Sequence, residues 1–456
     1  MALLKKGSPL NHTANETSHA TQIWQAGVDA VRADRLVRSA LHFENHQLSF
    51  DREAIDVKRI RQIVVVGGGK GGAEMALAVE AILGPEIVDE KLSGWVNVPD
   101  DCMRSTKKIH LHPARPAGVN EPTAAGIAGS DEILRRVSQL QADDLCIVLL
   151  SGGGSALLPA PQPPITLDHL LQVTRLLMHR GATIHELNTV RTWLSRMKGG
   201  GLARHCAADT LWGLIVSDVV GDPISIIASG PTVETESTAL EAVEILKRMP
   251  AEEVPEQVID FLQQQATKTP PQRSLPAQLT NRIIGNNAVA VSAAADKAKQ
   301  LGYEVLCWGS DNQGEASEEG QRFALRCQQL RDADEERNKR LCIISGGEPV
   351  VDLGPQAGKG GRNQQFVLAA VTELFSSGMT GITILSGGTD GEDGPTDAAG
   401  AVADASLIQR AQAQQLDPHH FLSEHDAYHF FDPLDGLLQT GPTQTNVMDL
   451  RVAIVE

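Results

Sequence analysis

The chain repeats one pattern, in which a short and uninterrupted apolar run ends abruptly in a glycine-rich loop. Five runs follow this pattern, at residues 63–66, 145–150, 211–216, 341–344 and 382–385. Strands that are apolar at every position are typical of a sheet covered by helices on both faces, which is the usual setting of parallel sheets. Ligands of such sheets bind at the carboxyl ends of the strands, where these loops lie. The pattern therefore predicts an α/β fold with functional residues in the loops.

Helical periodicity and its interruptions divide the chain into segments. One amphipathic pattern starts near Ile23, and another predicted helix at residues 73–83 ends at Gly84-Pro85. Residues 263–279 combine paired prolines with an absence of apolar periodicity, which is typical of a linker. We therefore expect a disordered N-terminus at residues 1–20, an N-terminal α/β domain at residues 21–275 and a C-terminal α/β domain at residues 280–456.

Charge and composition narrow the classes of function. With 40 Lys and Arg against 57 Asp and Glu, the net charge is −17 at pH 7. Nucleic acids and anionic membranes require clustered positive charge, so neither is an expected partner. Glycine supplies 42 of the 456 residues, and much of it lies in the loops that come after the apolar runs. Its position suggests that these loops lack side chains so that a small ligand can approach the backbone closely.

The remaining residue patterns favour a cytoplasmic protein. Six widely spaced cysteines without a Cys-x-x-Cys pair indicate reduced thiols, not a disulfide framework or a zinc ribbon. No apolar run approaches the ~20 residues of a membrane span, and the N-terminus lacks the apolar core of a signal peptide. The motifs H-E-x-x-H and G-x-S-x-G are absent, which argues against zinc and against an α/β-hydrolase. The sequence leaves the oligomeric state open, with a homodimer as one alternative.

The loop GGGKGG at residues 67–72 has three interpretations. It satisfies G-x-G-x-x-G between a predicted strand and a predicted helix, as in dinucleotide-binding proteins. The acid that would bind a ribose has only Glu86, Asp89 and Glu90 as candidates, and they follow no clear second strand. Lys70 inside the turn suits phosphate oxygens better, and a tight turn with an exposed lysine is the third interpretation. The spacing of a P-loop is absent.

Two acidic loops are candidates for general-base or Mg²⁺ chemistry. Asp218 directly follows the apolar run 211–216, where a carboxylate can act as a general base or as a magnesium ligand. The segment GTDGEDGPTD at residues 388–397 contains four acids. A solvated acidic turn is the default interpretation of such a segment, and metal or hydroxyl binding is the alternative that its glycines and its place after a strand support. Calcium is not expected, because the spacing of an EF-hand is missing.

Basic side chains occur in two further segments. Residues 188–203 predict a helix capped by the glycines at 199–201, with Arg191 and Lys198 exposed. Basic residues there usually complement the helix dipole, and binding of an anionic substrate is the alternative. Arg362, in GKGGRNQQ, precedes another predicted helix, and its guanidinium can form a fork with a carboxylate or a phosphate.

Taken in order, these loops resemble the type-2 glycerate kinase family, whose C-terminal portion is the segment called MOFRL. The resemblance extends from Gly67 to Val455 and rests on GGGK, SGGGSALLPAP, GATIHELNTVRTWLSRMKGGGLA, SDVVGDPISIIASGPT, GGEPVVDLGPQAGKGGRNQQ, SGGTDGEDGPTDAAGAV and GPTQTNVMDL. It implies a Rossmann-like N-terminal domain with a mainly parallel sheet, a smaller MOFRL-type α/β domain and an active site in the cleft between them. It also implies that ATP and Mg²⁺ are used to phosphorylate D-glycerate to 2-phosphoglycerate.

The resemblance also implies roles for individual residues. Lys70 matches the family's active-site lysine and Asp218 the aspartate of its SDV motif, so we expect Lys70 to neutralise phosphate charge and Asp218 to accept the hydroxyl proton. Glu348 and Arg362 match the acid of GGE and the arginine of GGRN. The complete expected set is Lys70 and Asp218 for catalysis, Arg362, Glu348, Arg191 and Ser155 for substrate binding, Gly67, Gly68, Gly69, Gly152, Gly153, Gly154, Lys198 and Asn446 for nucleotide and phosphate binding, and Asp390 and Asp393 for the metal.

Several positions depart from the family pattern. The usual HPxPD appears as HPARPA, without the aspartate, and GPTGTNVNDL has become GPTQTNVMDL, with Gln444 and Met448. Because glycine tolerates backbone conformations that glutamine disfavours, Gln444 leaves the conformation of that loop open.

Two other functions remain to be weighed, an NAD(P)-dependent hydroxypyruvate reductase and a non-catalytic binder of phosphorylated sugars. The expected substrates are anions, whereas the chain as a whole is acidic. We therefore expect a local positive cleft. Its expected members are Lys70, Arg191, Lys198, Lys359 and Arg362.

Overall fold

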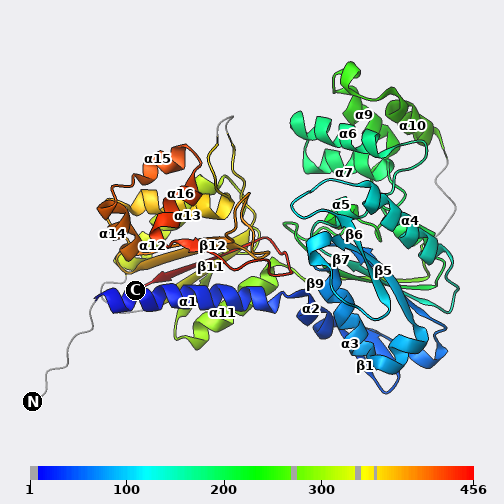
Figure 1. The fold of residues 1–456 in the computed structure, drawn as a ribbon, viewed down its shortest axis with the longest axis horizontal. Coiled ribbons are helices and arrows are strands. Elements are labelled where there is room, and N and C mark those ends of the chain that lie inside the picture. The colour runs from blue at the N-terminus through cyan, green and yellow to red at the C-terminus, as the bar shows by residue number, and fades with distance from the viewer. Residues whose placement is uncertain (1–8, 269–274, 334–339, 354–356) are drawn as a thin grey trace, which may run out of the picture. The chain divides into compact units, whose positions relative to one another are not determined.

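The computed structural model describes residues 9–268, 275–333, 340–353 and 357–456, and their contacts divide the chain into two units (Figure 1). Unit 2 is Ala33–Gly285, and unit 1 combines Met1–Arg32 with Asn286–Glu456. The division therefore falls later than the linker expected at residues 263–279.

That expected linker contributes instead to two elements of unit 2. Its first residues complete helix α10 (Glu256–Thr267), and its last residues begin strand β9 (Gln278–Gly285). Residues 269–274 lie outside the described ranges. The prolines of this segment indicated a linker, although its last residues begin a strand that completes the sheet of unit 2. The domain boundary expected between residues 275 and 280 is therefore wrong.

The N-terminal segment packs with the C-terminal residues in unit 1. Helix α1 (Pro9–Ala30) begins well before the expected start near Ile23, and it buries Ile23 and Trp24 in one cluster with helix α11 (Asn287–Gln300) and the sheet. Trp24 Nε1 donates a hydrogen bond to the carbonyl of Gly387 at 3.2 Å. The disorder expected for residues 1–20 is therefore wrong for residues 9–20, and residues 1–8 lie outside the described ranges. The polar composition of this segment concealed a helix stabilised by tertiary contacts.

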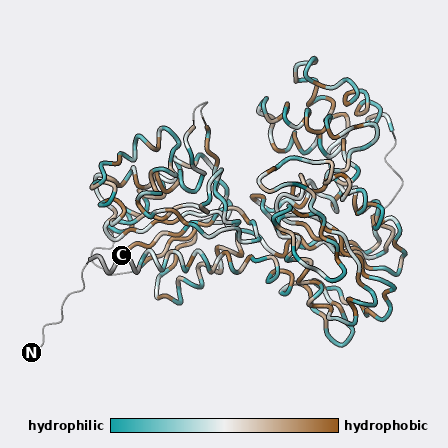
Figure 2. Tube along the Cα trace, viewed as in Figure 1, coloured by the Kyte–Doolittle hydropathy of each residue, from teal (hydrophilic) through white to brown (hydrophobic). Residues whose placement is uncertain are grey.

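Six parallel strands form the sheet of unit 2 in the order β6-β5-β4-β7-β8-β9. Counted along the chain, the order is 3-2-1-4-5-6, which is that of the Rossmann fold. The expected Rossmann-like parallel sheet is therefore confirmed. Its strands are β4 (Ile63–Gly68), β5 (Leu92–Pro99), β6 (Ile109–Arg115), β7 (Leu145–Leu150), β8 (Thr210–Val216) and β9 (Gln278–Gly285). Every residue of β4, β7 and β8 is buried. Hydrophobic segments run through the middle of this unit in Figure 2, around the place that β7 has in Figure 1.

Helices cover this sheet and form a separate layer. Helix α3 (Gly72–Lys91) follows β4, and Gly84, at φ 74°, interrupts it where the sequence predicts an end. Helices α4 (Ala124–Ser138) and α8 (Gly201–His205) pack in one apolar cluster with β4, β7 and β8. A second cluster joins α6 (Leu167–His179), α7 (Ile184–Trp193), α9 (Ala239–Lys247) and α10.

Unit 2 also contains shorter elements, three of which form a separate antiparallel sheet. They are helices α2 (Ala33–Ala40) and α5 (Gly154–Leu157), the antiparallel strands β1 (Leu41–Glu44), β2 (Gln47–Phe50) and β3 (Glu53–Asp56), and the 3-10 turns η1 (Val57–Arg59), η2 (Asp100–Cys102), η3 (Ile227–Ser229) and η4 (Ala251–Glu253).

Unit 1 is built on a mixed sheet with the order β10-β11-β15-β12-β13-β14. The last strand of the chain, β15, lies antiparallel between β11 and β12. Its strands are β10 (Glu304–Cys307), β11 (Leu341–Gly347), β12 (Ile382–Gly388), β13 (Gly400–Ala403), β14 (Leu437–Leu438) and β15 (Asp449–Val455). The expected second α/β domain is present. The apolar runs predicted coverage of both faces correctly, but they carry no information about the direction of the inserted strand.

Helices cover both faces of this sheet. Helices α1 and α11 lie against one face (Figure 1), and α12 (Ala316–Ala333), α13 (Arg362–Leu374) and α14 (Ala405–Ala413) pack on the other. The remaining short elements are α15 (Pro418–Ser423), α16 (Ala427–Phe431) and η5 (Asp432–Leu434). Within the described ranges, every helix of the protein is too short or too polar to cross a bilayer.

Glu16 provides a test of how α1 attaches to unit 1. Its side chain is 5% exposed, and burial, together with the neighbouring carboxyls of Glu456 and Asp404, raises the pKa of Glu16 to about 7. The folded carboxyl keeps its proton between about pH 4.5 and pH 7, where the unfolded one has released it. The contribution of this group to stability therefore falls as the pH rises through that interval.

We predict that Glu16→Gln flattens this pH dependence and raises Tm above pH 7. The expected gain is roughly 2–4 °C, which corresponds to about 1 kcal/mol in a unit of this size. Calorimetric unfolding between pH 5 and pH 8 measures both effects, with Glu373→Gln, at an exposed position of α13, as the matched control. An unchanged slope in Glu16→Gln would contradict the prediction.

Candidate functional site

Two glycine-rich loops meet where the strand order of unit 2 reverses, between β4 and β7. The backbone N–H of Lys70 donates to the carbonyl of Gly152 at 2.8 Å, and that of Gly71 donates to Ser151 Oγ at 3.0 Å. A Cβ atom on Gly69 would lie 2.0 Å from Ser151 Oγ, and the φ of Gly69 is +155°. Only glycine permits the loops to approach so closely.

This contact changes the expected phosphate site. The amides of the first loop are used by the structure itself, since the N–H of Gly69 also donates to the carbonyl of Asn97 at 3.1 Å. In the second loop, the N–H groups of Gly152 and Gly153 donate to no group in the described part of the chain. The backbone donors that remain for an anion therefore belong to residues 152–153, and the loop at 67–69 serves mainly to support them.

Two basic side chains pass over this second loop. Gly153 has a left-handed backbone with φ +77°, and a Cβ placed on it would lie 3.8 Å from Lys70 Cγ and 3.1 Å from Arg115 Nη2. Arg115 is buried at the end of β6, and its Nη1 donates to the carbonyl of Val119. The sequence prediction did not include Arg115, although a basic residue in HPARPA, at the end of a strand, was a signal for it.

Lys198 and Arg191 converge on one serine of the same region. Lys198 Nζ donates to Ser155 Oγ at 2.7 Å and to its carbonyl at 3.1 Å, and Arg191 Nη2 donates to Ser155 Oγ at 2.6 Å. Neither side chain forms an ion pair with a carboxylate of the described ranges. The three residues also line a cavity of about 20 Å³, which has room for roughly one water molecule.

The electrostatics of this cluster favour an anion. Burial, with the charge of Arg191 adding to it, lowers the pKa of Lys198 well below the usual lysine range, and burial lowers the pKa of Arg191 to about 10. A buried charge without a counter-ion is costly, and the arrival of an anion removes much of that cost. Ser155, Arg191 and Lys198, all expected site residues, therefore form one anion-receptive cluster.

The position of Lys198 corrects the predicted helix at residues 188–203. Helix α7 begins earlier, at a capping box formed by Thr183 and Glu186, and ends at Trp193. The chain then turns, because Ser195 Oγ accepts the N–H of Lys198 at 3.3 Å. Lys198 is 5% exposed, so the expectation that it faces solvent on a helix is wrong. Periodicity could not reveal a buried lysine in an irregular turn.

Ser229 completes the cluster, and it was not among the predicted residues. Its Oγ accepts a hydrogen bond from Lys198 at 3.3 Å, lies 3.0 Å from Ser155 Oγ and donates to Asn188 Oδ1 at 3.0 Å. Ser229 and Ala228 have φ of 60° and 51°, which is rare for residues other than glycine. Such strain costs of order 1–3 kcal/mol per residue and clusters at functional sites. The motif IIASGPT was the only signal for it.

Asp218 lies at the same edge of the sheet. It is half-buried directly after β8, the strand next to β7, and the N–H of Ser217 donates to the carbonyl of Gly285 at 2.9 Å. Because the carboxyl ends of parallel strands share one edge, the structure brings Asp218 to the edge that carries Lys70 and the loop with Ser155. Predicted residues of unit 2 therefore gather at one site.

Arg362 has other partners than the expected substrate. It begins α13, its Nε and Nη2 donate to the two carboxylate oxygens of Asp449 at 2.8 and 3.0 Å, and its Nη1 donates to Glu348 at 2.8 Å. Burial acts to lower the pKa of Arg362, but Asp449 and Glu348 raise it above its usual range. The structure thus brings Glu348 and Arg362 together, and the fork predicted for a substrate carboxylate is formed with Asp449.

The residues expected to hold Mg²⁺ have structural partners as well. Asp393 accepts the N–H groups of Asn363 and Gln364, both at 2.9 Å, and thereby caps α13. Burial raises the pKa of Asp393 to about 7, against the effect of these hydrogen bonds. Asp390 accepts the N–H of Glu392 at 3.1 Å. Across the described ranges there is no group of three or more metal-ligating side chains, so these residues do not fit a metal site made by the protein alone.

The last two predicted residues lie elsewhere in unit 1. Asn446 Oδ1 accepts the N–H of Met448 at 3.0 Å within a loop turn. Lys359 Nζ lies 3.5 Å from the centroid of the Tyr428 ring. Of the five cations expected in one cleft, Lys70, Arg191 and Lys198 gather around residues 151–155, whereas a single cleft for all five stays a prediction.

Comparisons with known proteins agree with this geometry. Residues 19–263 match the model of a domain of unknown function, DUF4147, and residues 341–449 match the MOFRL family. The chain is similar to a glycerate 2-kinase of Pyrococcus horikoshii (33% identity, covering 92% of this chain and 93% of that one) and to a putative hydroxypyruvate reductase of Agrobacterium vitis (37%, 86% and 87%). It is also similar to the crystal structure of a glycerate kinase from Thermotoga maritima, with 31% identity, a TM-score of 0.83 and coverage of 97% and 100%.

The pairing of Arg362 predicts a large structural effect of its removal. Asp449 is fully buried, and Arg362→Ala leaves its carboxylate without its two main donors. We predict a loss of about 3–5 kcal/mol of stability, the usual cost of breaking a buried ion pair. Chemical denaturation measures it. The double variant Arg362→Ala/Asp449→Asn should recover part of the loss, and unchanged stability of the single variant would contradict this assignment.

Lys198 is buried without a carboxylate partner among the described residues, so we predict that its removal stabilises the protein. Because burial lowers the pKa of Lys198, the cost of this group to stability is full at acidic pH and declines as the pH rises from that lowered pKa toward the usual lysine range. Lys198→Met should therefore raise Tm at pH 7 by roughly 2–4 °C, or about 1 kcal/mol. It should also abolish the stabilisation that added inorganic phosphate gives the wild type. Thermal unfolding with and without phosphate tests both effects. The control is Lys107→Met, at an exposed site, and a Lys198→Met variant that keeps the full phosphate effect would refute the assignment.

Proposed function

Because the chain belongs to the glycerate kinase family, an assignment that rests on similarity along nearly its whole length, we propose that its ATP-dependent phosphorylation of glycerate takes place at the loops of unit 2. We further propose that D-glycerate is the substrate and that its 2-hydroxyl is the acceptor, as the name of the Pyrococcus relative suggests. The product is then 2-phosphoglycerate. The six free cysteines are compatible with the proposal of a cytoplasmic enzyme.

One observation carries this assignment, namely the pair of buried cationic groups around Ser155. Lys198 and Arg191 have no carboxylate partner among the described residues, and both donate to Ser155, which follows Gly152 and Gly153 in the same loop segment. A site that combines buried cations with unused backbone donors is suited to a phosphate or a small carboxylate. ATP and glycerate together supply both kinds of anion.

The proposed transfer assigns a role to each group. The 2-oxygen of glycerate forms a bond to the γ-phosphorus while the bond from that phosphorus to the β,γ-bridging oxygen breaks, and ADP leaves. Asp218 accepts the hydroxyl proton, and Lys70 with the amides of residues 152–153 neutralises the charge of the transferred group. Phosphoryl transfer depends mainly on such positioning and charge stabilisation.

The glycerate carboxylate is better assigned to Arg191 than to Arg362. Arg362 is forked onto Asp449 and also donates to Glu348, so its surroundings carry more negative than positive charge. Among the described residues, Arg191 donates hydrogen bonds only to the oxygens of Ser155, and its charge acts on the neighbouring Lys198. A carboxylate that binds there meets uncompensated positive charge.

Mg²⁺ enters the proposal with the nucleotide. The described residues offer no cluster of three ligands, whereas Mg²⁺ commonly binds nucleotide phosphates with few protein contacts. When bound, the ion would neutralise part of the phosphate charge. Asp390 remains a candidate for contact with it, and Asp393 is engaged in capping α13.

The reductase alternative finds less support in unit 2. The three acids considered for a ribose, Glu86, Asp89 and Glu90, lie on helix α3. In dinucleotide-binding folds the acid stands at the end of the second strand, which here is β5. Asp100 and Asp101 follow this strand, but Oδ1 of Asp100 already accepts the N–H of Ala117 at 2.8 Å. The G-x-G-x-x-G pattern at 67–72 is accounted for by the approach of its loop to Ser151.

One assay separates the three functions. The full-length protein is incubated with D-glycerate, ATP and Mg²⁺, and ADP release is followed. Added enolase without a mutase then distinguishes the products, because only 2-phosphoglycerate yields phosphoenolpyruvate. Oxidation of NADH with hydroxypyruvate, in the absence of ADP release, would support the reductase and overturn the proposal. If neither reaction occurs, a non-catalytic binder remains.

Two substitutions test the central roles. We predict that Lys70→Ala lowers kcat at least 100-fold, since charge stabilisation by one group contributes roughly that much. Asp218→Asn should lower kcat by about 10²–10⁴-fold with a smaller change in KM, as removal of a general base does. Steady-state kinetics of both variants, with the exposed-site variants Lys107→Ala and Asp168→Asn as controls, provide the measurement. Near-normal turnover of Lys70→Ala would eliminate its proposed role.

A further inference from the structure

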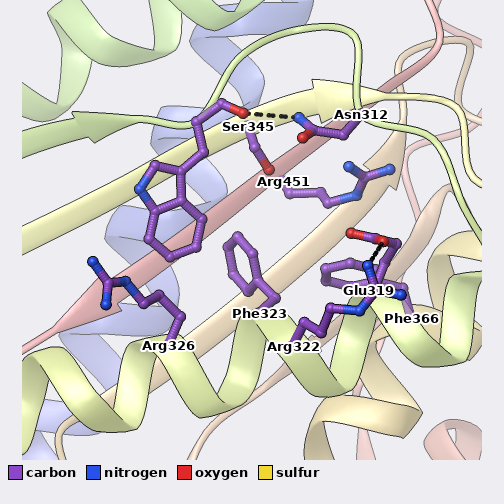
Figure 3. Close-up of a pocket in the computed structure, with 9 residues that line it drawn as sticks. Asn312, Glu319, Arg322, Phe323, Arg326, Ser345, Phe366 and Arg451 are labelled. Atoms are coloured by element: carbon purple, nitrogen blue, oxygen red, sulfur yellow. Dashed lines mark hydrogen bonds and ion pairs between the residues drawn. The ribbon is translucent and has the colours of Figure 1, made fainter.

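Unit 1 contains a pocket that the proposed reaction does not use. Its volume is about 280 Å³, at the lower end of the range for small-molecule sites. It lies between helix α12 and the strands β11 and β15 (Figure 3). Its lining residues are Trp308, Asn312, Glu319, Arg322, Phe323, Arg326, Ser345, Phe366 and Arg451.

Arg451 is the unusual member of this lining. The residue is 2% exposed, and its Nε and Nη2 are buried without a hydrogen-bond partner in the described ranges. Its nearest carboxylate oxygen belongs to Asp449, at 4.0 Å, and the same oxygen accepts a hydrogen bond from Arg362 at 2.8 Å. Burial lowers the pKa of Arg451, against the effect of Asp449. Such donors are costly to bury, so their presence beside a cavity indicates an anionic ligand.

Three aromatic side chains line one part of the pocket, beside its polar and charged members. The rings of Trp308 and Phe323 lie 5.2 Å apart between centroids, and those of Phe323 and Phe366 lie 5.4 Å apart, both edge to face. The guanidinium carbon of Arg451 lies 4.9 Å from the centroid of Phe366. A ligand that satisfies Arg451 therefore places its body against ring faces and edges, which favours an aromatic or other apolar group.

The charges at the rim also admit an anion. Arg326 is exposed and forms no ion pair with a described residue; its Nη1 donates only to Gln329, at 3.3 Å. Glu319 is the one acid of the lining, and its Oε1 accepts a hydrogen bond from Arg322 at 2.7 Å (Figure 3). The negative charge among the lining residues is thus already paired.

We propose that this pocket binds a small aromatic carboxylate, with the carboxylate on the Nε–Nη2 edge of Arg451 and the ring between Trp308, Phe323 and Phe366. A carboxylate matches two parallel N–H donors of a guanidinium. The three rings suit an aromatic body better than glycerate, which has no apolar group to place against them. The site is therefore a second ligand site of the enzyme, independent of the residues assigned to phosphoryl transfer.

Benzoate is the probe for this site, in calorimetric titrations of the full-length protein without ATP or glycerate. We expect one saturable site for benzoate per chain, with binding at least tenfold weaker for the neutral benzamide. Arg451→Met should weaken benzoate binding at least tenfold, and a methionine in place of a buried unpaired arginine should not reduce stability. The absence of saturable benzoate binding would overturn the proposal.

A second variant keeps the test independent of the contact between Arg451 and Asp449. Trp308→Ala removes one wall and leaves the guanidinium in place, so benzoate binding should fall while the response to inorganic phosphate stays as in the wild type. Equal affinities for benzoate and benzamide would exclude the ion pair with Arg451. None of these results depends on whether the kinase assay succeeds, because binding is measured without the substrates of the reaction.

Discussion

The structure of the candidate site depends on one constraint, the burial of two basic side chains without a carboxylate partner. Lys198 and Arg191 share the oxygens of Ser155, and the surrounding chain is arranged to make that possible. Ser229, with a left-handed backbone, provides a further acceptor for Lys198, and Asn188 in turn accepts from Ser229. Neutral oxygens orient the charges but cannot neutralise them. The site therefore remains electrostatically incomplete until an anion binds, as expected where stability is traded for function.

In unit 1, by contrast, an arginine is paired with carboxylates. Arg362 is held by Asp449 and Glu348, and Asp393 closes the N-terminus of the same helix. This network uses the acids that the sequence offered as metal ligands to hold α13 in place. Charge counting along the sequence could not distinguish the two cases, because pairing depends on which carboxylates the fold brings within hydrogen-bond distance. Arg451 shows the difference within a single strand, since it lies two residues from Asp449 and still lacks a hydrogen bond among the described residues.

Sequence patterns predicted the features that local physical chemistry determines. The apolar runs predicted buried strands correctly, and the Gly-Pro pair marked the position of a break at Gly84, although α3 continues beyond it to Lys91 and does not end there. Features set by distant contacts were missed: the early start of α1, the inserted antiparallel strand β15 and the burial of Lys198. The family departures at Gln444 and Met448 are an intermediate case. Both residues have positive φ, 63° and 70°, where the family pattern has glycine and asparagine, the two residue types that tolerate this conformation best.

The glycine surplus also has a more specific meaning than flexibility or a nucleotide fingerprint. In the first loop, Gly69 is required because a side chain there would collide with Ser151, and the amides of that loop are already used within the fold. In the second loop, Gly153 leaves room for Lys70 and Arg115 to pass, and the N–H groups of residues 152–153 stay available for a ligand. A G-x-G-x-x-G pattern can thus arise from the packing of two loops at a strand-order reversal. The basic side chains that the fold gathers around the neighbouring loop are the feature that separates an anion site from a dinucleotide site here.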